Sequence, residues 1–219
     1  MSLFMRGVIA TVAVSGLVLL SACGGGDDGS GKRDIEGAKD GGGQPASASP
    51  SASASASGDP GAPKLDLPEG VHVVLDGDDM TGDPEKDEIL RDHADAVNAM
   101  ALAYSTGKPD VPVVHTYFQD DAGKQVQSRV KEYRAEGKLG TGTYRYYDRR
   151  VTVGKEAAAV TFCESQRDAF AKMVDTGKVV HTKPSKSDFT SGKAIMEKRG
   201  GTWVVISMAG KGGDEECAR

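Results

Sequence analysis

The pattern of apolar and polar positions divides the chain into three parts. An apolar run covers residues 7–20, and residues 24–64 hold almost no apolar side chain larger than alanine. From residue 65 onward, apolar positions recur with the periods of helices and strands. This division predicts one folded domain over residues 65–219, preceded by segments that do not belong to its core.

The clearest periodicity predicts a helix over residues 84–106. Apolar side chains recur along it at spacings of four and three, which places them on one face: Leu90, Ala94, Val97, Ala101 and Tyr104. Asp83 is a favourable N-cap, Pro84 suits the first helical position, and Gly107 is a natural stop. His93 lies beside the apolar face, where we expect a structural or solvated side chain.

Beyond this helix, the periodicity changes from helical to alternating. Residues 113–118 are predicted as a short helical turn or strand, and a second helix is expected from about Ala122 to Glu136, with Gly137 as its stop. Strands are predicted where apolar residues alternate or cluster: 71–75, 141–148, 151–153, 157–166, 169–174, 178–183, 193–198 and 202–208. Trp203 is expected in the core. The order predicts an α+β fold, with N-terminal helices followed by a curved antiparallel sheet.

The N-terminal run has the organisation of an export signal. Arg6 precedes an apolar core of about 14 residues, shorter than the roughly 20 that span a bilayer as a helix. Leu20-Ser21-Ala22-Cys23 resembles the bacterial lipobox, in which the cysteine thiol takes a diacylglyceryl group and the new amino group is acylated. Residues 1–22 are therefore predicted to be a lipoprotein signal peptide, and Cys23 the lipidation site. An ordinary secreted product and an uncleaved anchor are the alternatives.

Residues 23–64 are predicted to be a disordered linker that follows the lipid attachment. Glycine triplets, an alternating Ser/Ala run over residues 46–57 and two prolines leave little apolar surface to offset the entropy of ordering. Two or three acyl chains on one residue suffice for stable anchoring. We therefore expect the protein at the outer face of the cytoplasmic membrane, with the membrane as its first partner. The serines are either a bare spacer or O-glycosylated.

Charge excludes one class of partner. The formal net charge is -5, with 5 basic and 12 acidic residues before position 84 and 22 basic and 20 acidic residues after it. Binding to nucleic acid requires a clustered basic face, which this near-neutral domain lacks. Nucleic acid is therefore not expected among the partners.

Candidate chemical groups do not form a recognisable site in the sequence. Four aspartates, Asp76, Asp78, Asp79 and Asp83, invite a calcium interpretation, but Met80 and Thr81 occupy the positions where an EF-hand loop needs an oxygen ligand and glycine. Asp148, His115 and His181 are possible acids or bases, yet no spacing pairs them. We therefore predict no catalytic set, no metal and no cofactor.

Two cysteines remain after Cys23. Cys163 and Cys217 form an even pair in an exported, oxidising setting, which favours a disulfide. They do not form a Cys-x-x-Cys motif, so redox work is not expected.

The C-terminal part resembles a group of small actinobacterial (Streptomyces-type) lipoproteins of unknown function. The resemblance rests on residues 140–148, 160–163 and 176–179 and on Cys217. Those proteins look like members of the NTF2-like superfamily, which implies a cone of helices and curved sheet. The cone hosts isomerases, dehydratases, polyketide cyclases and binding modules, so fold does not give function. We expect a non-catalytic module that binds a ligand, a protein or a cell-wall component. The alternative is an enzyme of the SnoaL or ketosteroid isomerase type acting on a small apolar substrate.

Overall fold

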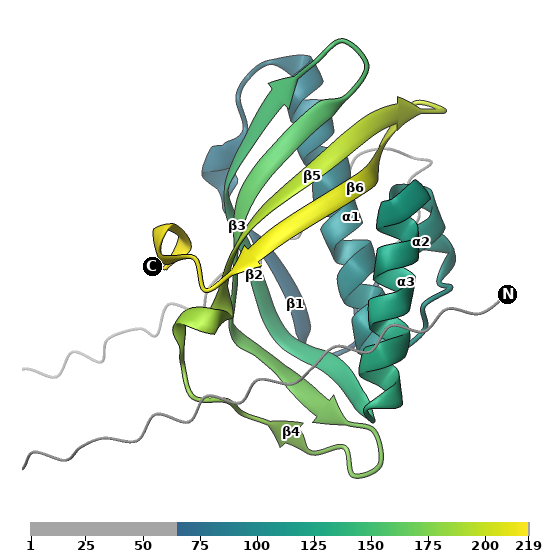
Figure 1. Ribbon diagram of the computed structural model, residues 1–219, viewed down its shortest axis with the longest axis vertical. Helices are drawn as coiled ribbons and strands as arrows, with labels where there is room; N and C mark the ends of the chain where they lie inside the picture. Colours follow the sequence, from purple (N-terminus) through teal and green to yellow (C-terminus); the bar gives the residue numbers. More distant parts are fainter. Residues whose placement is uncertain (1–64, 219) are drawn as a thin grey trace, which may run out of the picture. The chain divides into compact units, whose positions relative to one another are not determined.

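The computed structural model describes residues 65–218 (Figure 1). The predicted signal peptide, the lipidation site Cys23 and the linker lie outside these residues and stay predictions. Within the described part, none of the helices has the length and apolar character needed to cross a bilayer. The helices are α1 (Pro84–Thr106), α2 (Pro112–Tyr117) and α3 (Asp120–Ala135), with 3₁₀ turns η1 (Gly77–Asp79), η2 (Lys186–Asp188) and η3 (Glu215–Cys217). The strands are β1 (Val71–Leu75), β2 (Lys138–Val153), β3 (Ala158–Met173), β4 (Val179–Val180), β5 (Phe189–Arg199) and β6 (Thr202–Gly212).

The strands form one curved sheet in the order β1-β2-β3-β5-β6, with β4 paired to β3. Three helices followed by a curved sheet confirm the predicted α+β class. The prediction of an antiparallel sheet needs one correction, because β1 pairs with β2 in parallel. The reason is topological: β1 and β2 are separated by the three helices, and this long connection returns the chain in the same direction. The sheet is therefore mixed.

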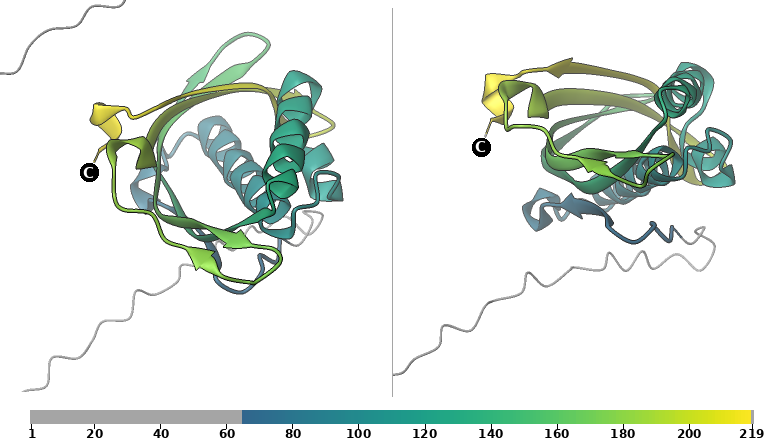
Figure 2. Two further views of the ribbon diagram at one scale, coloured as in Figure 1. Left: turned by 60° about the horizontal axis from the view of Figure 1, so that its bottom comes forward. Right: turned by 90° about the horizontal axis from the view of Figure 1, so that it is seen from below.

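The helices α1 and α3 lie against the concave face of the sheet, as two views show (Figure 1, Figure 2). The Asp83 carboxylate accepts hydrogen bonds from the backbone N–H groups of Glu85 and Lys86, and Gly107 adopts a left-handed conformation with φ of 65°. Both ends of α1 are therefore those that the sequence predicts. Its buried face also includes Ile89, His93, Ala99 and Ala103, so it is broader than the predicted stripe.

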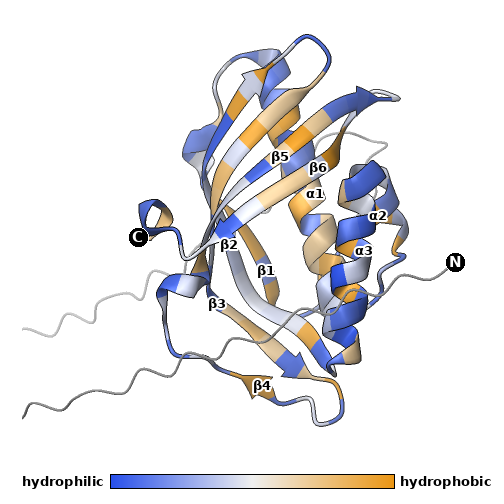
Figure 3. Cartoon of the chain, viewed as in Figure 1, coloured by the Kyte–Doolittle hydropathy of each residue, from blue (hydrophilic) through white to orange (hydrophobic). Residues whose placement is uncertain are grey.

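The core lies between the helices and the middle of the sheet. Its fully buried side chains come from all layers: Ile89 and Leu90 of α1, Val114 of α2, Val126 and Val130 of α3, Val160 of β3, Met196 of β5 and Val205 of β6. Figure 3 shows hydrophobic residues concentrated along α1 and in the middle of β5 and β6. Trp203 is 6% exposed and belongs to this core, as predicted.

The strand β2 is longer than the sequence pattern indicates. The sequence pattern predicts two strands, at residues 141–148 and 151–153. In the structure they belong to one strand, whose pairing with β3 shifts register between Tyr147 and Arg150. Asp148 has a φ of 52° at this irregularity. Because an extra residue reverses the alternation of side chains, the pattern appears interrupted although the strand continues. The predicted strands 157–166 and 169–174 likewise form the single strand β3.

Candidate functional site

The three residues considered as acids or bases lie on separate elements. Asp148 occupies the irregularity of β2, His115 is exposed on α2, and His181 follows β4 with its ring 4.4 Å from that of Phe170. The structure therefore does not bring them together as one set.

The aspartates of the acidic turn stabilise the fold through other contacts. Asp76 pairs with Arg145 at 3.1 Å, and Asp79 pairs with Arg149 at 2.6 Å. Both side chains of the second pair are nearly inaccessible, at 7% and 5% exposure, and Arg149 also donates to the carbonyl of Leu90. Within residues 65–218, no group of three His, Cys, Asp or Glu side chains is arranged to hold a metal ion.

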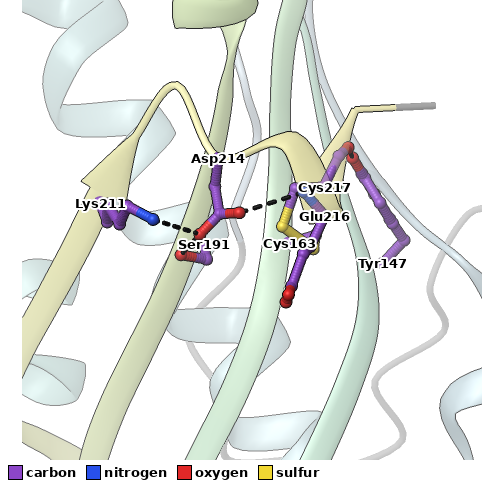
Figure 4. The surroundings of a disulfide bond; sticks show 7 residues. All are labelled: Tyr147, Cys163, Ser191, Lys211, Asp214, Glu216 and Cys217. Carbon is purple, nitrogen blue, oxygen red and sulfur yellow. Dashed lines mark hydrogen bonds and ion pairs between the residues drawn. A yellow bond between two sulfur atoms is a disulfide. The ribbon is translucent and has the colours of Figure 1, made fainter.

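The predicted disulfide between Cys163 and Cys217 is present (Figure 4). Cys163 lies on β3, and its bond fastens η3 to the outer face of the sheet. Tyr147 donates a hydrogen bond to the carbonyl of Cys217, and Asp214 accepts one from Ser191 at 2.7 Å. Cys217 is 1% exposed, so the disulfide itself is buried on the η3 side although the residues next to Cys217 are exposed.

An open groove of about 630 Å³ lies beside this disulfide. It is lined by both charges, with Arg150 and Lys193 on the basic side and Asp148 and Glu216 on the acidic side. The mixed charge and shallow form give this groove no clear preference for a ligand.

The concave face carries a cluster of polar and aromatic side chains that the sequence pattern does not predict. We call this set the tyrosine–glutamate cluster: Tyr104 of α1, Tyr133 of α3, Tyr144 and Tyr146 of β2, and Glu164 of β3. These elements surround one end of the domain, seen in Figure 2 (left). Because side chains alternate along β3, Glu164 lies on the same face as Val160 and Phe162. Its carboxylate therefore points toward the concave side of the sheet.

Direct contacts join the members of the cluster. Tyr146 donates a hydrogen bond to Oε1 of Glu164 at 3.1 Å, and Gln166 donates to the same oxygen at 2.9 Å. The rings of Tyr104 and Tyr133 meet edge to face, with 5.7 Å between their centroids. A Cβ at Gly140 would lie 2.6 Å from the Tyr144 hydroxyl and 3.3 Å from the Cβ of Tyr104, so these two tyrosines also lie close together.

Several polar atoms of the cluster have no partner among residues 65–218. The hydroxyls of Tyr104, Tyr133 and Tyr144 make no hydrogen bond there, and Oε2 of Glu164 receives none. All four side chains belong to partly exposed residues, so solvent reaches this end of the domain. The cluster therefore presents unused donors and acceptors beside aromatic rings.

Burial shapes the electrostatics of the cluster. It raises the pKa of Glu164, although hydrogen bonds from Gln166 and Tyr146 oppose the shift. It also raises the pKa values of Tyr144 and Tyr146, and the nearby Glu164 adds to both shifts. The phenols therefore stay protonated and remain able to donate hydrogen bonds.

The next layer of the concave face is filled. The His93 ring is 2% exposed and lies 4.9 Å from that of Phe162, which in turn lies 5.7 Å from that of Tyr146. Burial, with a contribution from Arg149, lowers the pKa of His93 to about 3. Nδ1 of this neutral ring has no hydrogen-bond partner among the residues that the structure describes. His93 is thus a buried structural residue, which is one of the two alternatives expected for it.

No family model matches the sequence, and no curated protein is a significant match. Matching solved structures include the intermembrane-space region of the chloroplast protein ARC6, with 13% identity, a TM-score of 0.42 and coverage of 61% of this chain and 99% of that one. An NTF2-like superfamily protein from Salmonella enterica has 13% identity, a TM-score of 0.39 and coverage of 56% and 89%. A protein described as a candidate dehydratase of the NTF2-like family from Streptomyces avermitilis has 12% identity, a TM-score of 0.37 and coverage of 60% and 98%. These likenesses concern the outline of the fold, and no functional conclusion rests on them.

Proposed function

We propose that the protein is a lipid-anchored extracytoplasmic binding module that takes a small ligand at the tyrosine–glutamate cluster. One observation carries the proposal: three phenol hydroxyls and one carboxylate oxygen of the cluster have no hydrogen-bond partner among residues 65–218. Ligand sites typically combine apolar or aromatic walls with a few convergent polar groups. The cluster has this composition, and four of its five residues are partly exposed, all except Tyr146.

The anchoring half of the proposal rests on the sequence around Cys23. The apolar core, the lipobox and the linker follow one another in the order that a lipoprotein requires. The test is incorporation of radiolabelled palmitate in the native host, where the unchanged chain takes up label and the Cys23→Ala variant does not. Label that persists in the Cys23→Ala protein contradicts the anchor.

The ligand half is tested by native mass spectrometry. The chain from Gly24 to Arg219, exported so that its disulfide forms, is incubated with an extract of the cell envelope. We expect a small-molecule adduct on the unchanged chain and its loss from the Glu164→Gln/Tyr144→Phe variant. The Lys193→Ala variant, altered only in the outer groove, serves as the matched control and keeps the adduct. An adduct that is lost from the control and kept by the cluster variant contradicts the proposal.

A second candidate function is enzymatic, and the Tyr146–Glu164 contact favours it. A carboxyl group whose pKa burial raises, facing a phenol, has the components of a general base and a hydrogen-bond donor. The discriminating measurement is the fate of the captured compound. Recovery of the compound unchanged after prolonged incubation supports binding alone, whereas conversion that Glu164→Gln abolishes supports the enzyme.

A further inference from the structure

Within the described part of the chain, the carboxylate of Glu164 has no positively charged partner. Its hydrogen-bond donors are the neutral side chains of Tyr146 and Gln166, and both contact Oε1. Among residues 65–218, no lysine, arginine or histidine forms an ion pair with it. Removing a charged carboxylate from water is costly unless an opposite charge or further hydrogen bonds compensate it. A cation supplied by a ligand provides that compensation.

Aromatic rings around Glu164 favour the same kind of ligand. The face of a tyrosine ring carries negative electrostatic potential, so it attracts cations that lie over it. The Tyr146 hydroxyl contacts Glu164 directly at 3.1 Å. Tyr144 of β2 and Tyr104 of α1 meet beside Gly140, where a Cβ would lie 2.6 Å from the Tyr144 hydroxyl and 3.3 Å from the Cβ of Tyr104. Aromatic rings that supply negative faces, together with a carboxylate that supplies negative charge, are components with which proteins recognise ammonium groups.

The edge of the cluster already shows this chemistry within the chain. Nζ of Lys138 lies 5.9 Å from the centroid of the Tyr133 ring and forms an ion pair with Glu136 at 2.7 Å. One ammonium group is thus held between a tyrosine ring and a carboxylate. Glu164 and its tyrosines offer the same combination, and no ammonium group of residues 65–218 forms an ion pair with Glu164.

We propose that the ligand of the tyrosine–glutamate cluster carries an organic ammonium group, which lies between Glu164 and the tyrosine rings. This inference rests on the proposed function and deepens it by naming the ligand class. Oε2 of Glu164 meets the positive charge, the rings contribute cation–π attraction, and the free hydroxyls of Tyr104 and Tyr144 accept hydrogen bonds from the polar part of the ligand.

The test compares two probes that differ in charge alone. Choline carries a quaternary ammonium, and 3,3-dimethylbutan-1-ol is its neutral counterpart of the same shape. Calorimetric titration of the chain from Gly24 to Arg219 is expected to give choline a dissociation constant at least about tenfold lower than that of the alcohol. Glu164→Gln is expected to remove this difference, whereas Glu156→Gln, the same chemical change at an exposed turn, leaves it intact.

The other outcomes contradict either the ammonium inference or the assignment of the site to Glu164. If both probes bind equally and Tyr104→Leu abolishes their binding, the ammonium inference is overturned, but the proposed site is retained. Absence of choline binding to a folded chain overturns the inference, while the envelope adduct still tests the proposed function. The Glu164→Gln variant must first show the circular dichroism of the unchanged chain. If this folded variant binds choline as tightly as the unchanged chain does, the assignment to this carboxylate is overturned.

Discussion

Tyr146 and Glu164 are directly opposite one another on β2 and β3, and the Tyr146 hydroxyl donates a hydrogen bond to the Glu164 carboxylate at 3.1 Å. This pair connects the architecture of the sheet to the proposed site. The register sets the two side chains on the concave face, and burial there raises the pKa of Glu164. The hydrogen bond moderates that shift, because it stabilises the ionised form.

Tyr146→Phe is therefore expected to raise the pKa of Glu164 further. The variant removes one of two donors to the carboxylate, so the charged form loses stabilisation and takes up its proton at higher pH. The shift is measured from the ¹³C resonance of the Glu164 carboxyl during a pH titration. Tyr144→Phe is the control, because its hydroxyl makes no bond to Glu164, and it should leave the titration nearly unchanged. Equal titrations in Tyr146→Phe and the unchanged chain contradict the contact.

Loss of the disulfide is expected to destabilise the domain. Cys163 and Cys217 are 54 positions apart, and closing a loop of that size contributes about 4 kcal/mol in the chain-entropy model. The Cys163→Ser/Cys217→Ser double variant should thus lose up to this amount, measured by urea denaturation under non-reducing conditions. The matched comparison is the unchanged chain with its disulfide reduced. If the double variant and the reduced chain have the same free energy of unfolding as the oxidised chain, the bond does not constrain the fold.

The buried pair of Asp79 and Arg149 gives a separate test of stability. Asp79→Asn leaves a guanidinium that is 5% exposed without its counter-charge, which typically costs about 3 kcal/mol or more. The neighbouring Asp78→Asn, at an exposed position, should change the free energy of unfolding by less than about 0.5 kcal/mol. Similar denaturation midpoints for the two variants would show that the pair is not buried in solution.

His93 is expected to make the domain sensitive to acid. Its pKa is about 3 in the folded chain and 6.5 in a free side chain, so below pH 6.5 the unfolded state binds a proton that the folded state does not. Stability from this group is complete above pH 6.5 and falls as the pH decreases toward 3, with a loss of about 2 kcal/mol at pH 5. His93→Phe should reduce that loss in thermal unfolding at pH 7 and 5. His115→Phe, at an exposed position, should retain it, and an equal loss in both variants would argue against a buried neutral histidine.

The sequence was informative where structure depends on neighbours along the chain. The ends of α1 follow from Asp83, Pro84 and Gly107, which act within one turn of the helix. The extent of β2 was missed because the irregularity at Asp148 reverses the side-chain alternation. The parallel pairing of β1 was also missed, since it joins residues about 70 positions apart along the chain, as in Val71 with Gly142.

The candidate site was missed for a related reason. The sequence marked the tyrosines as apolar or alternating positions and passed over Glu164, whose spacing from Val160 and Phe162 indicates a carboxylate on the inward face of β3. What the sequence could not show is the register that sets Glu164 opposite Tyr146, or the helix packing that brings Tyr104 next to Gly140 and Tyr144. These relationships depend on long-range contacts.

A crystal structure of the chain with the compound captured from the cell envelope is the decisive test of ligand binding at the tyrosine–glutamate cluster. We expect ligand density in contact with Tyr104, Tyr144 and Oε2 of Glu164, with the outer groove beside Cys163 and Cys217 free of it. Density confined to that outer groove, with the tyrosine–glutamate cluster contacted by water alone, would contradict the account.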